Sequence, residues 1–168
     1  MTIIDNAVYV EGVRTATPRN LEQTFETLSE QGGMAWIGLY RPTRDEMTAV
    51  AHEFGLHELA VEDAVSAHQR PKLERYDNNL FTVLRPARYL DASETVEFGE
   101  LHIFTGPNFV VTIRHAETGG VARVRHRLEQ RPGPPAAWTG SGTLRPPGPG
   151  GGRLCTCRCR ARERHRRN

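Results

Sequence analysis

The sequence contains no cysteine before Cys155, so disulfides cannot hold its first 154 residues together. It has no run of about 18 apolar residues, which excludes a membrane-spanning helix. Its first residues, M-T-I-I-D-N, lack the basic region and the apolar core of a signal peptide. These absences predict a cytosolic chain that is stabilised by an ordinary apolar core.

Sequence patterns typical of enzymes are also missing. There is no glycine-rich phosphate loop, no G-x-S-x-G and no Cys/His nucleophile pattern. His52 and His57 flank Glu53, but their spacing is one residue longer than in H-E-x-x-H, and Gly55 interrupts the helix between them. The two histidines therefore cannot share a helix face as a zinc protease requires. We expect no enzyme, no catalytic residue and no organic cofactor.

The charge is divided unevenly along the chain. Residues 1–131 contain 14 Lys and Arg against 19 Asp and Glu, a formal charge of −5, whereas residues 132–168 contain 8 Arg against one Glu, or +7. The acidic body gives no electrostatic reason to expect a nucleic-acid partner. The basic end is most simply interpreted as a solvated or non-native tail.

The composition places a boundary near residue 130. At 168 residues the chain has the length of one domain. Residues 131–168 are dominated by Gly, Pro and Arg and show no periodicity, so we expect a disordered tail after a domain at residues 1–130. Cys155, Cys157 and Cys159 in this tail do not have the paired spacing of a tetrahedral zinc site and are interpreted as incidental thiols.

Hydrophobic periodicity predicts alternating strands and helices in the body. The predicted strands are residues 3–11, 13–16, 34–40, one bent or two separate strands within 72–90, 96–104 and 109–114. The predicted helices are residues 21–30 after an Asn20 cap, a helix that begins at the Thr43–Glu46 capping box and ends at Gly55, a short helix from Leu56 that ends before Pro71, and residues 121–130 with Val121, Val124 and Leu128 on one side. This order indicates the α/β fold class, with a mixed sheet flanked by helices.

Glu62 and Asp63 form an adjacent acidic pair on the third predicted helix. Taken alone, such a pair is most often a solvated helix face. Hard divalent cations are bound by carboxylate oxygens, and magnesium keeps several waters while it contacts one or two carboxylates. Glu62 and Asp63 could thus contribute to a magnesium site if a partner surface supplies the remaining ligands.

The ordered motifs W-I-G-L-Y-R-P-T-R-D-E-M, F-G-L-H-E-L-A-V-E-D-A, Q-R-P-K-L-E-R-Y-D-N-N-L-F and N-F-V-V-T-I-R-H resemble the amino-terminal cytosolic domain of CorA-type magnesium channels. The resemblance covers about residues 34–130. It implies a homopentameric magnesium and cobalt channel in the plasma (inner) membrane, with this domain on the cytoplasmic side. Such a subunit continues into a long stalk helix and two membrane helices.

The resemblance also implies a role for the acidic pair. In the family, the aspartate of the L-E-D motif, here Asp63, faces the stalk of the neighbouring subunit and holds a weak regulatory magnesium there. Glu62 would lie near a second site. Acids that repel one another across an interface are bridged by the cation, so its loss opens the assembly. Magnesium or cobalt ions and like subunits are thus the expected partners.

The sequence departs from the family pattern after about residue 130. It shows no stalk, no membrane helices and no Gly-Met-Asn loop, so we expect a cytosolic regulatory domain that cannot transport ions by itself. The alternative is a stand-alone soluble regulatory or interaction module. Two apolar segments and Gly-Met-Asn in the downstream DNA would favour a broken channel, and their absence would favour the module.

A shifted reading frame would explain this departure. When the codons from Gly133 onward are read one base later, favourable synonymous codons allow D-L-L-R-P-G-P-E-A-V-L-Y-A-L-L-D-L-V-V-D-G-Y-A. This amphipathic sequence resembles the family's helix before the stalk. We therefore expect residues from about Pro132 onward to be frameshifted, which sequencing of the DNA would test.

Overall fold

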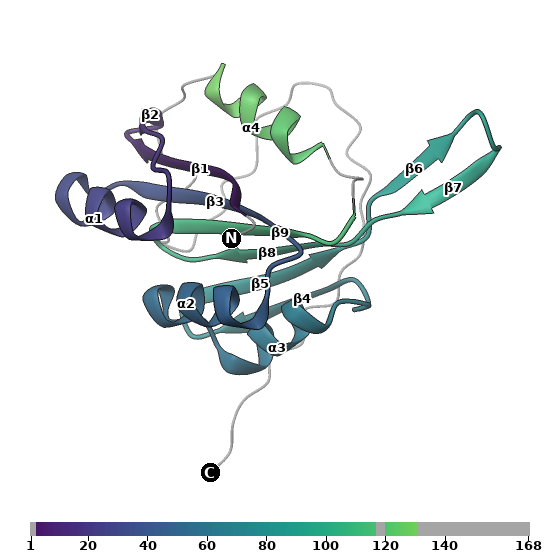
Figure 1. The fold of residues 1–168 in the computed structure, drawn as a ribbon, viewed down its shortest axis with the longest axis horizontal. Coiled ribbons are helices and arrows are strands. Elements are labelled where there is room, and N and C mark those ends of the chain that lie inside the picture. The colour runs from purple at the N-terminus through teal and green to yellow at the C-terminus, as the bar shows by residue number, and fades with distance from the viewer. Residues whose placement is uncertain (1–2, 117–119, 131–168) are drawn as a thin grey trace, which may run out of the picture.

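Strands from distant parts of the chain combine into one mixed sheet in the computed structural model, which describes residues 3–116 and 120–130 (Figure 1). The seven strands of this sheet lie in the order β2-β1-β3-β9-β8-β5-β4. Neighbours are antiparallel except β3 and β9, which are parallel. The strands are β1 (Ile3–Val10), β2 (Val13–Ala16), β3 (Met34–Tyr40), β4 (Lys72–Tyr76), β5 (Asn79–Leu84), β8 (Leu101–Thr105) and β9 (Phe109–Arg114). The predicted fold class is confirmed.

The capping residues define the helices as the sequence predicted. The Asn20 side chain accepts a hydrogen bond from the Gln23 N–H at the start of α1 (Leu21–Gln31). Thr43 and Glu46 form a reciprocal capping box before α2 (Arg44–Phe54). Gly55 ends α2 in the left-handed conformation, at φ 60°, which glycine adopts without a steric penalty.

Two strand predictions were wrong in their boundaries. Residues 72–90 form three strands. Asp77 adopts a positive φ of 51°, and Asp77-Asn78 makes a tight turn between β4 and β5, whereas Arg85-Pro86 separates β5 from β6. Residues 96–104, predicted as one strand, are divided at Gly99-Glu100. The earlier part is β7 (Thr95–Phe98), which pairs with β6 (Ala87–Leu90) in a separate two-stranded sheet. The later part is β8, which forms an antiparallel hairpin with β9.

The main apolar core lies between the sheet and three helices, α1, α2 and α3 (Glu58–Ser66). Its buried members come from all three helices and from β3, β5, β8 and β9. The largest completely buried apolar side chains are those of Ile37, Leu39, Met47, Phe81, Phe104 and Ile113. This core fixes α3, which carries the predicted acidic pair, against the sheet.

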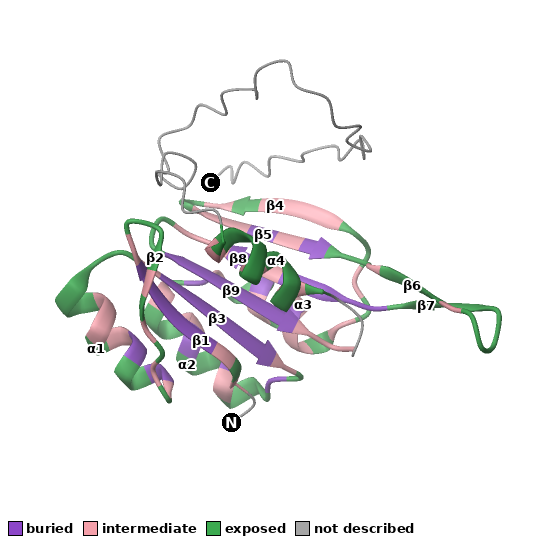
Figure 2. Ribbon diagram, turned by 90° about the horizontal axis from the view of Figure 1, so that it is seen from above, coloured by how far each residue is buried: buried purple, intermediate pink, exposed green. Residues whose placement is uncertain are grey.

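The opposite face of the sheet is covered by α4 (Val121–Glu129) in Figures 1 and 2. A smaller cluster of Ala7, Tyr9, Trp36 and Val110 lies there, with Val121 packed against it. Of the three apolar residues predicted to share one side of this helix, Val124 and Leu128 are exposed. Besides Val121, Arg125 and Glu129 contact the sheet, one and two turns later, through Asp5 and Tyr9 of β1. Residues 131–168, with the predicted disordered tail and its cysteines, lie outside the described part.

Candidate functional site

The Asp63 carboxylate on α3 is paired with an ammonium group from the sheet. Lys72 Nζ, at the start of β4, lies 2.5 Å from Asp63 Oδ2 and 2.9 Å from Glu74 Oε2. Tyr76 Oη donates a further hydrogen bond of 2.9 Å to Glu74 Oε2. Lys72, Glu74 and Tyr76 share the strand face turned toward α3, because side chains two residues apart on a strand point the same way. Two carboxylates therefore share one cation.

The charge balance of this group shifts the pKa values of Lys72 and Tyr76. Burial opposes the charged form of Lys72, but its hydrogen bonds to Asp63 and Glu74 outweigh this and raise the Lys72 pKa above its ordinary value of 10.5. Burial, followed by the hydrogen bond to Glu74, raises the pKa of the Tyr76 hydroxyl. Lys72 Nζ also lies 5.4 Å from the centroid of the Phe81 ring. Both acids are thus held next to a fixed positive charge.

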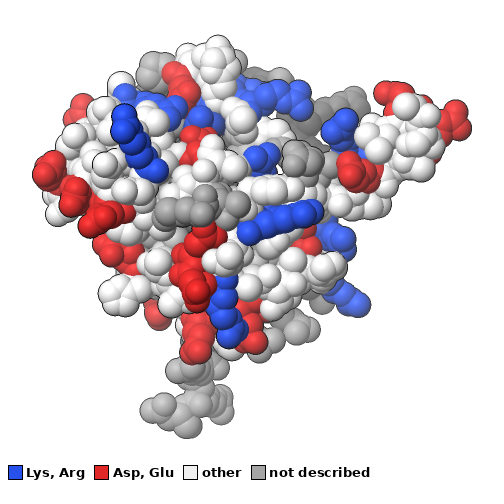
Figure 3. Space-filling model, in the orientation of Figure 1, with Lys and Arg blue, Asp and Glu red and all other residues white. Residues whose placement is uncertain are grey.

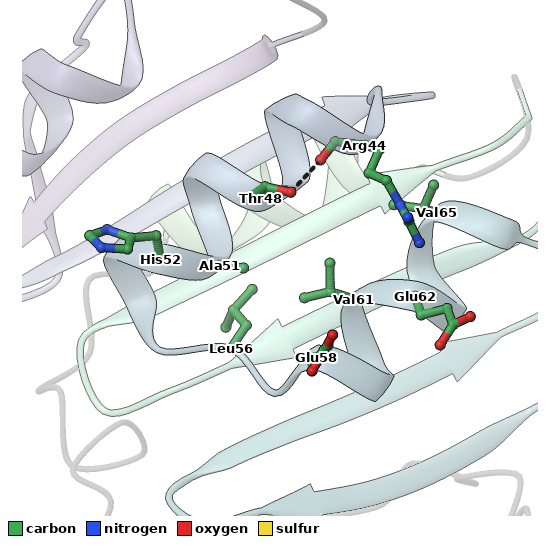
Figure 4. Close-up of a pocket in the computed structure, with 9 residues that line it drawn as sticks. All are labelled: Arg44, Thr48, Ala51, His52, Leu56, Glu58, Val61, Glu62 and Val65. Atoms are coloured by element: carbon green, nitrogen blue, oxygen red, sulfur yellow. Dashed lines mark hydrogen bonds between the residues drawn. The ribbon is translucent and has the colours of Figure 1, made fainter.

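Glu62 lies on a different side of α3 from Asp63. Its exposed side chain lines a groove of about 560 Å³ between α2 and α3 (Figure 4). Arg44 extends from the start of α2 toward the end of the groove where Glu62 lies (Figure 4). Apolar side chains line the middle of the groove, and they come from Ala51, Leu56, Val61 and Val65. The structure therefore does not bring Glu62 and Asp63 together around one point.

The loop after α3 is held by a buried carboxylate. Ala67 and His68 both adopt a positive φ, 54° and 60°, which directs the backbone N–H groups of His68 and Gln69 toward Glu100. Each N–H donates a hydrogen bond of 2.9 Å to a different oxygen of the Glu100 carboxylate. Non-glycine residues rarely adopt this conformation, and it persists where the surrounding contacts stabilise it. Glu100 thereby fixes the loop that connects Asp63 with Lys72.

A completely buried histidine completes this attachment. His102 Nε2 lies 2.6 Å from Glu100 Oε1 and must donate, because an ionised carboxylate only accepts. Burial lowers the pKa of His102 despite the nearby Glu100 charge. Burial alone would raise the pKa of Glu100, but the N–H donors and the His102 ring outweigh it and lower that pKa. His115 supports the same end of α3, since its Nε2 lies 2.8 Å from the Ala64 carbonyl oxygen.

The two histidines of the H-E-x-x-x-H stretch lie in separate surroundings. His57 caps α3, where its Nδ1 accepts a hydrogen bond from the Leu59 N–H, and its ring stacks on Tyr76. His52 lies in the last turn of α2 beside the groove. Within the described residues, no three His, Cys, Asp or Glu side chains come together as a metal site would require. The described carboxylates near α3 could supply only part of a coordination shell.

Sequence reasoning missed the partners of Asp63. Lys72 and Glu74 were noted only as letters of a family motif, although their spacing of two, together with Tyr76, gives a polar strand face where an apolar one is usual. Glu100 and His102 carried no motif at all. The signal for them was the same spacing of two across the start of β8, in a strand that is otherwise apolar.

Two known proteins are similar in sequence to more than half of this chain. The first, "Putative metal ion transporter YfjQ" of Bacillus subtilis, is 40% identical over 97 residues, which are 58% of this chain and 29% of that protein. The cobalt/magnesium transport protein CorA of Thermotoga maritima is 30% identical over 101 residues, 58% of this chain and 28% of that protein. The chain thus spans less than a third of the length of these relatives.

Solved structures show the same fold at lower identity. The full-length CmaX protein superposes with a TM-score of 0.63 at 20% identity, over 79% of this chain and 41% of that one. The soluble domain of CorA from Methanocaldococcus jannaschii superposes with a TM-score of 0.51 at 15% identity, over 79% of this chain and 49% of that one. In residues 3–116 and 120–130, no helix is long and apolar enough to cross a lipid bilayer.

The family assignment follows from a match to a family sequence model. The sequence model described as "CorA-like Mg2+ transporter protein" matches residues 31–139, from the end of α1 through the acidic α3, the β8–β9 hairpin and α4. This range is well over half of the chain. The predicted resemblance is confirmed, and the family is one of ion transporters rather than enzymes. The chain belongs to the CorA-like Mg²⁺ transporter family.

Proposed function

We propose that this domain is the cytosolic regulatory part of a CorA-type magnesium and cobalt transporter. In this proposal Asp63 forms one side of a regulatory magnesium site, and a neighbouring like subunit supplies the other side. The names of the relatives support the ion class, because the Thermotoga maritima protein is a cobalt/magnesium transport protein. The regulatory role is supported by the position of Asp63 on α3, where its side chain lies outside the apolar core.

One observation carries the proposal: Lys72 bridges Asp63 and Glu74 through a single ammonium group. Two carboxylates that both contact one nitrogen lie close enough to repel each other when that charge is removed. They therefore need a cation, and in the separate subunit Lys72 provides it. A neighbouring subunit that brings further carboxylate oxygens would shift the balance toward Mg²⁺, which takes carboxylate and water ligands.

Lys72 would then act as an internal competitor of magnesium. When the ion is present, the Lys72 ammonium is displaced and the Asp63 carboxylate turns to the metal. When the ion leaves, Lys72 again pairs with Asp63, and the acids of the neighbouring subunit lose their bridge. This exchange gives the weak, assembly-dependent affinity that a sensor of ample cytosolic magnesium needs.

Glu62 has a separate role in this proposal. It lines the groove between α2 and α3, whereas Asp63 is paired with Lys72, so we do not assign the two carboxylates to one ion inside one subunit. We assign it to a second site of lower affinity, where the nearby Arg44 limits the attraction of cations.

Magnesium titration of the full 168-residue chain, followed through the backbone amide signal of Asp63 by NMR, tests the exchange. The wild-type chain should show only weak, non-saturating shifts at millimolar magnesium, because Lys72 already neutralises Asp63. The Lys72→Met variant keeps the length of the side chain but removes its charge. It should bind at least about tenfold more tightly, because the two carboxylates then lack a cation.

The Lys72→Met/Asp63→Asn double variant is the matched control and should lose the gained affinity. Glu62→Gln in the Lys72→Met background should keep it. Tight, stoichiometric binding by the wild-type monomer would contradict the proposal. An unchanged affinity in Lys72→Met would contradict it as well, and would favour a regulatory module that works without this ion.

A further inference from the structure

The two-stranded sheet of β6 and β7 projects from the body of the molecule as a hairpin (Figures 1 and 2). Its strands pair with each other and with no strand of the main sheet. An isolated hairpin of this kind is at best marginally stable in water, and it usually gains stability by packing against something else. We therefore expect this hairpin to pack against a partner surface.

One face of the hairpin is apolar and exposed. Tyr89 pairs directly with Val96, and Ala87 pairs with Phe98, so the four side chains lie on the same face. Tyr89, Val96 and Phe98 are between 51% and 61% exposed, among the highest values for large apolar residues in the described chain. Contiguous exposed apolar residues of this kind mark interaction surfaces more often than single exposed ones do.

The hairpin is also acidic. Residues 87–98 contain one arginine and three acidic residues, Asp91, Glu94 and Glu97, which gives a formal charge of −2. Figure 3 shows acidic side chains at its free end, where Asp91 and Glu94 lie in the turn. A partner that fits must therefore combine an apolar stripe with basic side chains.

Helix α4 has this combination. Val124 and Leu128, four residues apart, lie on one side of the helix and are 51% and 46% exposed. Arg123 and Arg127 are exposed beside them, and residues 121–129 have a formal charge of +2. The sheet side of α4 is used by Arg125 and Glu129, so its apolar stripe is left for another contact.

We propose that the acidic hairpin of one copy packs on the basic α4 of the next copy, in a head-to-tail contact. The apolar residues Tyr89, Val96 and Phe98 would cover Val124 and Leu128, while Asp91 and Glu94 face Arg123 and Arg127. An apolar centre with a charged rim is the usual composition of a protein interface. Two different surfaces of one chain join in this way into a ring or a filament, and not into a symmetric dimer.

We choose a second copy as the partner because both complementary surfaces belong to the same chain, and this choice rests on the assembly of like subunits proposed above. The contact needs neither magnesium nor Asp63. Its failure and the failure of the magnesium site can therefore be told apart.

Sedimentation velocity of the full chain in magnesium-free reducing buffer, from about 10 μM to about 1 mM, tests the contact. The sedimentation coefficient should rise with concentration. Phe98→Glu should abolish the rise, because it places a charge in the apolar centre. Glu94→Arg and Arg127→Glu should each weaken self-association about fivefold, and the double reversal should restore it, since the two charges are then exchanged.

Leu59→Glu is the matched control, because Leu59 is similarly exposed, at 54%, but lies on α3 at the opposite face of the sheet. It should leave self-association unchanged. Tyr89→Ser is a second hairpin variant in case Phe98→Glu disturbs folding, which circular dichroism would show. A wild-type chain that stays monomeric, an equal effect of Leu59→Glu, or no restoration by the double reversal would overturn the proposal.

Discussion

The two faces of the seven-stranded sheet are covered in different ways. On the α3 side, three helices bury a continuous apolar cluster that includes Phe81 and Phe104. On the α4 side, a single helix is attached largely by polar groups. Arg125 pairs with Asp5, and Tyr9 Oη donates a hydrogen bond of 2.6 Å to Glu129. The α3 face is thus stabilised by the burial of apolar surface area, and the α4 face by a few ion pairs and hydrogen bonds.

This difference suggests that the α3 face stabilises the domain, whereas the α4 face is available for contact with another subunit. Burial of apolar area contributes roughly 25 cal/mol per Å², so the α3 face should dominate the stability of the domain and hold Asp63 at a fixed position. The polar contacts of α4 are worth about 1 kcal/mol each and specify where the helix lies more than how strongly it is held. The apolar residues that α4 does not use on the sheet remain exposed for a partner.

The largest effect is expected at the centre of the α3 face. Phe81 is 1% exposed and packs against the Phe104 ring at a centroid distance of 4.7 Å. Phe81→Ala should lower the free energy of unfolding by about 3–5 kcal/mol, through lost burial and a residual cavity. Urea denaturation measures this. Phe98→Ala, the same change on the hairpin, should lower the free energy of unfolding by less than about 0.5 kcal/mol. Equal losses in the two variants would show that the α3 face does not dominate the stability of the domain.

The buried Glu100 should have the next largest effect. Glu100→Gln replaces one acceptor oxygen by an NH₂ group, and one of the three donors to Glu100 is then left unsatisfied. Hydrogen bonds to a buried charge are worth about 1.5–3 kcal/mol, which is the expected loss in urea denaturation at pH 7. Glu97→Gln on the exposed hairpin should be neutral. If both variants are equally stable, Glu100 does not hold the loop after α3.

The same pair predicts an acid-sensitive α3 face. The folded pKa values of His102 and Glu100 both lie below their ordinary values of 6.5 and 4.5. The unfolded chain then binds more protons, so the stability from both groups is present above pH 6.5 and is lost as the pH falls, first through His102 and then through Glu100. The difference in the free energy of unfolding between wild type and His102→Phe should change as the pH falls below 6.5. If the two proteins lose stability in parallel, His102 is not a source of the acid sensitivity.

The α4 face should respond more weakly. Tyr9→Phe removes the hydrogen bond to Glu129 while it keeps the buried ring, and it should cost about 0.5–1.5 kcal/mol. Burial, together with this hydrogen bond, raises the pKa of Tyr9, so the hydroxyl stays protonated at neutral pH. Hydrogen exchange should show faster opening of α4 than of α3. Tyr89→Phe on the exposed hairpin is the control and should leave exchange unchanged.

The sequence allowed most elements of the fold to be predicted, because their signals are local. The Asn20 cap, the Thr43–Glu46 capping box and the Gly55 stop each act within one helical turn. The mixed sheet followed from the alternation of strands and helices. The order of the strands could not be predicted, since the parallel pairing of β3 with β9 joins segments about 75 residues apart, as Ile37 with Val111 shows.

The candidate site was predictable only in part. Asp63 was located through a family motif, but its pairing with Lys72 depends on the conformation of the loop between them. Glu100, which is distant in the sequence, fixes that conformation through hydrogen bonds from the loop. The sequence predicted that Val121, Val124 and Leu128 share one side of α4, but it did not show which side of the helix contacts the sheet. In the structure, ion pairs and a tyrosine hydroxyl decide which side of this helix contacts the sheet.

The smallest effect on stability is expected at Leu128. This variant is the most specific test of the difference between the two faces of the sheet. Leu128 is 46% exposed, so Leu128→Ala removes little buried area, and alanine is the better helix former. The free energy of unfolding should change by less than about 0.5 kcal/mol at micromolar concentration. Self-association should nevertheless weaken, because the same side chain belongs to the proposed contact with the hairpin. Urea denaturation and sedimentation of one variant thus separate two roles of α4, and a loss of stability without a loss of association would place Leu128 in the core of its own chain.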